Sequence, residues 1–187
     1  MILALAGVTG VGKSFFKDKL VEKLDFKKVN TIRTREIRKN EKNGVDGIFM
    51  SKKELDECEK EGKIAYRFSV FGGEYGYLKE EIFSKDNMIF EMHYTTIDDW
   101  KKVREDIVAI YILPVDLDQA KQQTLKRGLS KEKEEERLRE IDLQYNYFVK
   151  DKSLQDKFDY VFYNNFDEES ENKLIELVKE IMSKNKE

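Results

Sequence analysis

Apolar and polar positions along the chain predict strands that alternate with helices. The pattern predicts strands at residues 2–6, 26–31, 87–92, 107–113 and 159–163. After the first of these, Phe16, Leu20 and Leu24 recur at helical spacing among charged residues. Strands that alternate with helices are typical of a parallel, doubly wound sheet. The pattern therefore predicts an α/β fold with about five strands in that sheet.

Local signals place further elements. Ser51 and Glu54 have the spacing of a capping box and predict a helix that ends near Lys60. Residues 64–70 have the composition of a strand, and 71–77 that of a glycine-rich turn. Similar signals predict helices over 79–84, 116–127, 130–149 and 168–184. In the third of these we expect the apolar side chains to face the core: Leu138, Ile141, Leu143, Tyr145 and Phe148.

Composition and charge narrow the class of protein. The 35 lysines and arginines nearly balance the 38 aspartates and glutamates, so no overall field attracts nucleic acid or membranes. The single cysteine, Cys58, cannot form an internal disulfide and fits a reducing cytoplasm. No apolar run approaches the roughly 20 residues of a membrane span. The first apolar run lacks a basic leader and a cleavage site, so we interpret it as a strand. The oligomeric state stays open.

The candidate chemistry begins directly after the first strand. The stretch reads Gly7-Val8-Thr9-Gly10-Val11-Gly12-Lys13-Ser14, which is the phosphate-loop pattern of Gly, four residues and Gly-Lys-Ser. Its glycines let backbone N–H groups approach a polyphosphate, and the following helix presents its N-terminus to the anion. Lys13 is expected on the β- and γ-phosphates and Ser14 on Mg²⁺. The order of strand, loop and helix predicts a nucleoside triphosphate site.

Two further features allow two interpretations each. The basic stretch 31–47 contains Arg33, Arg35 and Arg38, which form either a solvated loop or a second phosphate site. Glu91 ends the apolar strand 87–92. It is either a carboxylate that faces magnesium or a structural acid that hydrogen-bonds the phosphate loop.

The whole chain resembles the guanylate kinase family of nucleoside monophosphate kinases, and the resemblance extends well beyond the phosphate loop. Thr31-Ile32-Arg33-Thr34-Arg35-Glu36-Ile37-Arg38 keeps the hydroxyl, the Thr-Arg pair and the second arginine of the family motif, with Ile37 in place of proline. The other matching motifs are Val45-Asp46-Gly47, Tyr75-Gly76, Ile112-Leu113-Pro114, Arg127-Gly128, Arg137-Leu138 and Tyr160-Val161-Phe162-Tyr163-Asn164. Their order and spacing hold over nearly the whole chain.

The resemblance implies a fold and a division of labour. It implies one domain of the phosphate-loop NTPase fold, with a core of residues 1–30, 84–126 and 140–187, a monophosphate-binding lobe of 31–83 and a helical lid of 127–139. The implied activity is transfer of a phosphoryl group from ATP, with Mg²⁺, to a nucleoside monophosphate, with GMP as the first choice. Catalytic roles fall to Lys13, Arg35, Arg127 and Arg137. Thr31, Arg35, Arg38 and Tyr75 would bind the phosphate of the acceptor, and Asn164 would lie near the adenine.

Three positions that read the base also depart from the family pattern. Where the family reads guanine with a glutamate, a small hydroxyl residue and an aspartate, this chain has Tyr66, Tyr77 and His93. Together with Glu91, these residues are candidates for binding the acceptor, and Glu74 is a possible substitute for the missing glutamate. The acceptor is therefore GMP, another monophosphate or a sugar phosphate. A non-catalytic binding module is a further alternative, against which the intact Lys13 argues.

Overall fold

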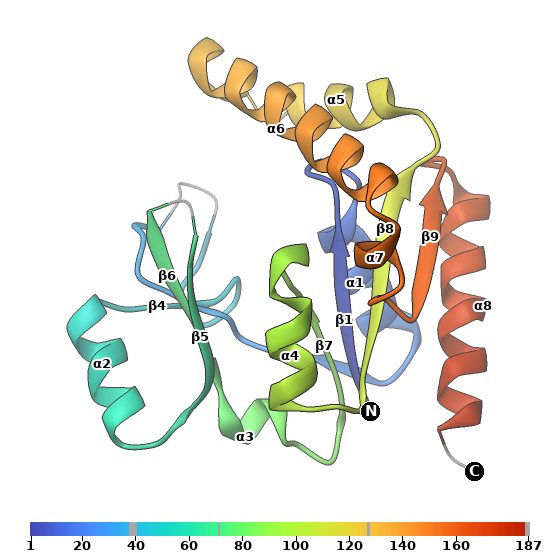
Figure 1. The fold of residues 1–187 in the computed structure, drawn as a ribbon. Coiled ribbons are helices and arrows are strands. Elements are labelled where there is room, and N and C mark those ends of the chain that lie inside the picture. Colours follow the sequence, from blue (N-terminus) through green and yellow to red (C-terminus); the bar gives the residue numbers. More distant parts are fainter. Residues whose placement is uncertain (38–40, 71, 127, 186–187) are drawn as a thin grey trace.

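A five-stranded parallel sheet forms the centre of the molecule in the computed structural model, which describes residues 1–37, 41–70, 72–126 and 128–185 (Figure 1). The order of its strands is β2 (Phe26–Lys28), β7 (Asn87–Glu91), β1 (Ile2–Gly7), β8 (Ile107–Pro114) and β9 (Tyr160–Asn164). Every neighbouring pair is parallel. All six residues of β1 are buried, because the sheet is covered on both faces. The predicted α/β sheet is confirmed.

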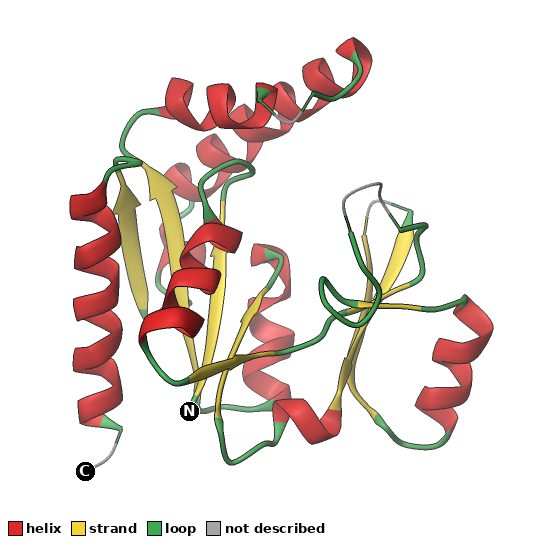
Figure 2. Cartoon of the chain, turned by 180° about the vertical axis from the view of Figure 1, so that it is seen from behind, coloured by secondary structure: helices red, strands yellow, loops and turns green. Residues whose placement is uncertain are grey.

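Helices cover the two faces of this sheet. Figure 2 shows α1 (Lys13–Lys23) and α8 (Glu168–Lys184) on the face turned toward the viewer, with α4 (Ile97–Val103) and α7 (Lys152–Gln155) behind the sheet. Trp100 anchors α4 and is fully buried. The predictions included neither α4 nor α7, nor the short 3-10 helix Tyr94–Thr96. Short helices of this kind carry too few residues for a periodic pattern to be read from the sequence.

A second, four-stranded sheet stands beside the core (Figure 1). Its strand order is β4 (Ile48–Phe49), β3 (Ile32–Arg33), β6 (Gly73–Leu78) and β5 (Ile64–Val70). Helix α2 (Lys52–Lys60) begins with the predicted capping box of Ser51 and Glu54, and α3 (Lys79–Ile82) follows β6. This sheet lies within residues 31–83 of the chain.

The structure corrects one strand prediction in each sheet. Residues 73–77 belong to strand β6 rather than to a turn, and residues 26–31 form a strand only as far as Lys28. Gly76 reflects close packing, because a Cβ atom there would lie 2.9 Å from Leu55 Cδ1 on α2. Aromatic pairs across the strands, such as Phe68 and Tyr75 with ring centroids 5.3 Å apart, hold β6 in the sheet.

Two helices lie near the carboxyl edge of the central sheet. They are α5 (Leu117–Leu125), which Asp116 caps as predicted, and α6 (Lys131–Lys150). The N-terminal turns of α6 extend from the core toward the side of the second sheet (Figures 1 and 2). On α6, Ile141 and Phe148 are buried as predicted, but Leu143 is 71% exposed. The buried face passes through Ile141, Gln144 and Phe148, and Leu143 lies off that face.

Candidate active site

A cavity of about 230 Å³ lies between the carboxyl edge of the central sheet and the second sheet. Many of its lining residues come from four parts of the chain. The phosphate loop and α1 contribute Gly7, Thr9, Lys13 and Lys17, and the second sheet with the segment before it contributes Thr31, Arg33, Phe68, Tyr75 and Tyr77. The end of β7 and the residues after it contribute Glu91, Met92, His93 and Tyr94, and α6 contributes Arg137, Glu140 and Gln144. Segments far apart in the sequence thus meet at one site beside the loop.

The phosphate loop has the backbone shape that its sequence predicts. Val8 and Val11 are fully buried, so the loop is fixed to the core by its apolar side chains. Gly10 has a φ of 80°, and a Cβ atom there would lie 2.4 Å from Thr124 Oγ1 on α5. Lys13 Nζ donates hydrogen bonds to the carbonyl oxygens of Gly7 (2.9 Å) and Val8 (3.0 Å). The lysine therefore lies over the loop, where a polyphosphate would meet its charge.

Asn164 braces the same loop from strand β9. Its side chain is 3% exposed, and its Nδ2 donates to the carbonyl oxygen of Val11 over 3.0 Å. Its Oδ1 accepts a hydrogen bond from the N–H of Phe166 over 2.8 Å. Both polar ends of the amide are thus bonded to backbone. The predicted contact of Asn164 with adenine stays a prediction.

Glu91 connects β7 to the helix that follows the loop. Its carboxylate forms a 2.6 Å ion pair with Lys17 of α1. Burial alone would raise the pKa of Glu91, but the charges of Lys17 and Lys13, with a hydrogen bond from Ser14, hold it below its usual value. Of the two interpretations of Glu91, this geometry favours the structural acid that supports the loop.

Arg33 of strand β3 lines the cavity, whereas it was predicted only as one of three arginines in the basic stretch 31–47. Its guanidinium group donates to the carbonyl oxygen of Asp46 and lies 5.6 Å from the centre of the Phe49 ring. Thr31 and Tyr75, both predicted to bind the acceptor, line the same cavity. Thr31 and Arg33 are two positions apart, and in an extended chain this spacing puts both side chains on the same face. The spacing is therefore the sequence signal that could have identified Arg33 as a lining residue.

Arg35 is paired with a carboxylate of the neighbouring segment, and its predicted role in binding the acceptor stays a prediction. Its two terminal nitrogens donate to the carboxylate of Glu41 over 2.7 and 2.6 Å, and it does not line the cavity that the described residues form. The hydrogen bond to Glu41 raises the pKa of Arg35 despite partial burial. The predicted residues Arg38 and Arg127 lie outside the residues that the structure describes.

The two tyrosines at the base-reading positions are placed differently from each other. Tyr66 donates to Asp99 Oδ2 over 3.1 Å and packs 4.8 Å from the ring of Trp100. Burial and the bond to Asp99 raise its pKa to about 12. Tyr77 is 2% exposed and also packs on Trp100, while its hydroxyl donates to the backbone oxygen of Glu91 and borders the cavity. Tyr66 thus packs against α4, and Tyr77 reaches the candidate site.

His93 and Glu74 complete the set of expected residues. His93 lines the cavity, stacks on Tyr94 and has its Nδ1 2.7 Å from Thr95 Oγ1. Burial and the nearby Lys13 hold the pKa of His93 below its usual value, against the opposing charge of Glu140. Glu74 lies 2.5 Å from Lys52 and also pairs with Arg67, so it serves an ion-pair network beside α2. This placement does not support Glu74 as a substitute reader of the base.

Helix α6 brings three polar side chains to the cavity. Arg137 was predicted, whereas Glu140 and Gln144 were not. Glu140 accepts hydrogen bonds from both of the others, and Gln144 also contacts the phosphate loop. These residues recur at intervals of three and four, which places them on one side of the helix. That spacing was a usable signal within a segment that is otherwise rich in charge.

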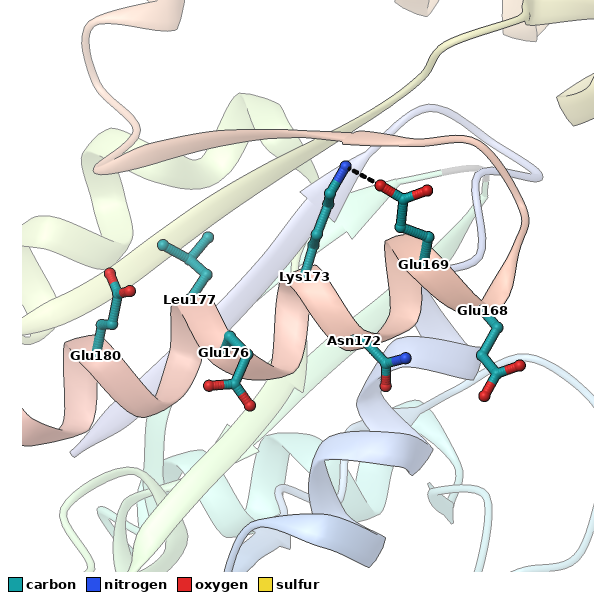
Figure 3. A pocket seen from close by; sticks show the side chains of 7 residues that line it. All are labelled: Glu168, Glu169, Asn172, Lys173, Glu176, Leu177 and Glu180. Atoms are coloured by element: carbon teal, nitrogen blue, oxygen red, sulfur yellow. Dashed lines mark ion pairs between the residues drawn. The ribbon is translucent and has the colours of Figure 1, made fainter.

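A larger hollow of about 570 Å³ lies along α8 and shares no lining residue with the cavity beside the loop (Figure 3). It is lined by Glu168, Glu169, Asn172, Lys173, Glu176, Leu177 and Glu180. Lys173 points toward Glu169, and a 2.6 Å ion pair joins the two (Figure 3). This is a charged, solvated helix face. We therefore take the smaller cavity beside the loop as the candidate active site.

Within the described residues, no group of three or more histidine, cysteine, aspartate or glutamate side chains is arranged to hold a metal ion. A magnesium site that depends on a serine hydroxyl and phosphate oxygens needs no such group, because Mg²⁺ keeps several water and phosphate ligands. Among the same residues, no helix has both the length and the apolar character that a membrane crossing requires.

Comparisons with known proteins point to one family. The family model described as guanylate kinase matches residues 1–184. A guanylate kinase of Mycoplasma mobile is 33% identical, over 88% of this chain and 85% of its own length. One from a Wolbachia of Brugia malayi is 28% identical over 88% and 84%. The crystal structure of guanylate kinase from Anaplasma phagocytophilum superposes with a TM-score of 0.70 at 23% identity, covering 96% of this chain and 84% of that one.

Proposed function

The chain belongs to the guanylate kinase family, and we propose that it transfers the γ-phosphoryl group of ATP to GMP, giving ADP and GDP. One observation carries the proposal. A single cavity is lined by the phosphate loop on one side and by an arginine and aromatic side chains of a second sheet on the other. Phosphoryl transfer depends mostly on positioning and on neutralising oxygen charge, which suits two facing anion sites.

On the donor side, the loop amides and Lys13 would hold the β- and γ-phosphates. The residues fit Mg²⁺, because the hydroxyl of Ser14 lies in the first turn of α1 beside the carboxylate of Glu91. When bound, the ion would neutralise charge on the phosphate oxygens. Glu91 would act through its bond to Lys17, which fixes α1 against β7.

On the acceptor side, Thr31, Arg33 and Tyr75 line the cavity. Arg35 follows in the chain and would exchange Glu41 for the phosphate of the acceptor, since a guanidinium group binds either anion in bidentate fashion. Phe68 and Tyr75 stack on each other at the cavity wall. Flat aromatic surfaces suit a planar base, which favours a nucleotide acceptor over a sugar phosphate.

Residues 31–83 would act as the acceptor lobe and residues 127–139 as a lid within one domain. Arg137 would then approach the transferring group from α6, and closure would exclude water that competes for it. We place the reaction in the cytoplasm, where the single cysteine stays reduced.

The test is a coupled assay of ADP release with Mg²⁺ and ATP. The acceptors are GMP, dGMP, IMP, AMP, CMP, UMP and ribose 5-phosphate. We expect GMP to give the highest kcat/KM. Preference for another nucleotide would move the proposal to that acceptor, and preference for the sugar phosphate would replace it. Turnover equal to background ATP hydrolysis with every acceptor would contradict kinase activity.

A further inference from the structure

A glutamine of α6 holds one of the amides of the phosphate loop. The backbone N–H of Thr9 donates to Gln144 Oε1 over 2.8 Å, although 135 positions of the chain separate the two residues. Gln144 is 8% exposed and lies on the buried face of α6 with Ile141 and Phe148. A buried amide side chain needs partners for its polar atoms, and here the loop supplies one.

The amide nitrogen of Gln144 is connected through Glu140 to Arg137, the arginine predicted to belong to the lid. Gln144 Nε2 donates to Glu140 Oε1 over 2.9 Å. The second oxygen of Glu140 accepts a hydrogen bond from Arg137. Glu140 and Arg137 both line the cavity. A continuous series of hydrogen bonds therefore runs from Arg137 through Glu140 and Gln144 to the backbone of Thr9.

This connection differs from the other supports of the loop. Asn164 holds the carbonyl of Val11 from β9, and Thr124 packs against Gly10 from α5. Neither Asn164 nor Thr124 lies on the helix that carries Arg137. Gln144 does, so a shift of α6 changes the contact at Thr9 and the position of Arg137 together.

We infer that Gln144 is a positioning residue for phosphoryl transfer. By taking the Thr9 N–H, it fixes the peptide at the start of the loop so that the amides that follow face the polyphosphate. Through Glu140 it also sets the position of Arg137 relative to the loop. The inference rests on the proposed binding of ATP. It assigns the effect on ATP affinity to Gln144 and the effect on turnover, through Arg137, to Glu140.

Two substitutions separate these effects. Gln144→Met keeps the length of the side chain but leaves the Thr9 N–H without its acceptor, so the Kd for ATP should rise about tenfold. Glu140→Gln keeps an oxygen for Gln144 Nε2 but removes the charge that pairs with Arg137. That variant should bind ATP within about twofold of the unsubstituted protein and lose severalfold in kcat, because Arg137 acts on the transferring group. Gln123→Met, at an exposed position of α5, is the matched control.

The measurements are calorimetric titration with a non-hydrolysable ATP analogue, steady-state kinetics with GMP, and amide hydrogen exchange at Thr9. We expect the ATP site to weaken in Gln144→Met while KM for GMP changes by less than about threefold, and Gln123→Met to match the unsubstituted protein. If the unsubstituted protein fails to bind the analogue, the proposed function fails. If it binds and Gln144→Met binds equally well, the inference alone is overturned.

Exchange at Thr9 keeps the test informative when Gln144→Met does not fold. In the unsubstituted, ligand-free protein, the Thr9 amide should exchange at least about tenfold more slowly than an exposed loop amide. Exchange as fast as that of an exposed amide would overturn the inference without any variant. Protection that persists unchanged in a folded Gln144→Met variant would overturn it as well.

Discussion

The phosphate loop and the lobe of residues 31–83 are the two regions proposed to bind anions, but their polar groups are satisfied in opposite ways. The loop is backbone, fixed by buried Val8 and Val11 and by side chains from α6 and β9. The lobe of residues 31–83 relies on guanidinium groups, and oxygen atoms of the same lobe already bond to them. Arg35 pairs with the carboxylate of Glu41, whereas Arg33 donates to the backbone carbonyl of Asp46.

The two regions differ because backbone amides are neutral, whereas guanidinium groups carry a full charge. Backbone dipoles need no counterion, so an amide site can be fully formed before its ligand arrives. A partly buried guanidinium group without a partner is costly, and the folded lobe therefore supplies one. Under the proposed function, the donor site is preformed, whereas the acceptor would have to displace Glu41 from Arg35. The predictions below test this contrast, from the largest expected effect to the smallest.

Removing the charge of Lys13 should have the largest effect. Lys13→Met should lower kcat/KM by about 10²–10³-fold, because no other part of the loop places a full positive charge on the phosphates. Steady-state kinetics with ATP and GMP measure the loss. Lys28→Met, which removes an exposed lysine paired with Asp18, is the control and should stay within about twofold. Equal losses in the two variants would contradict the role of Lys13.

Removing the guanidinium group of Arg35 should affect the acceptor alone. Arg35→Ala should raise KM for GMP about 10–100-fold, since charge-assisted bidentate bonds to phosphate are lost, with little change in the Kd for ATP. Kinetics and calorimetry on the same preparation separate the two quantities. Equal weakening of ATP and GMP would show that Arg35 supports the fold rather than the acceptor.

Removing the charge of Glu41, the partner of Arg35, should change KM for GMP in the opposite direction. Glu41→Gln removes the competing charge, so KM for GMP should fall about threefold if the acceptor has to displace that carboxylate. A rise in KM would instead mean that Glu41 holds Arg35 in its productive position. Either result refines the comparison between the preformed site and the occupied one.

The smallest expected effect is that of removing the charge of Glu91 on the free energy of unfolding. Glu91→Gln should lower the free energy of unfolding by about 1–2 kcal/mol at pH 7, because the ion pair with Lys17 is lost. The folded-state pKa of Glu91 lies below its ordinary value of 4.5. Its contribution is therefore present above pH 4.5 and disappears as the pH falls through the lower, folded-state pKa.

Urea unfolding at pH 7 and at decreasing pH measures this difference. The gap between the unsubstituted protein and Glu91→Gln should narrow as the solution becomes more acidic. Glu22→Gln, at a largely exposed position of α1, is the control and should show a small gap at every pH. A gap for Glu91→Gln that stays constant with pH would contradict the ion-pair explanation.

The sequence predicts the central sheet and the loop well because their signals are local. The strand, the glycines, Lys13 and the start of α1 are consecutive, and so are the cap of α2 and the first turn that it supports. The errors lie where long-range packing decides. Gly76 looked like part of a turn but packs against Leu55, and Leu143 looked like a core residue but is exposed.

By itself, then, the sequence determined that the chain builds a phosphate loop between a buried strand and a helix, since each contact involved lies within a few residues of the next. Only the tertiary structure decided which partners the polar side chains have. It brought Gln144 to Thr9, Tyr66 to Asp99 and Arg33 to the cavity wall. Such pairings depend on how distant segments pack, because a polar group bonds to whichever partner the folded chain places within about 3 Å.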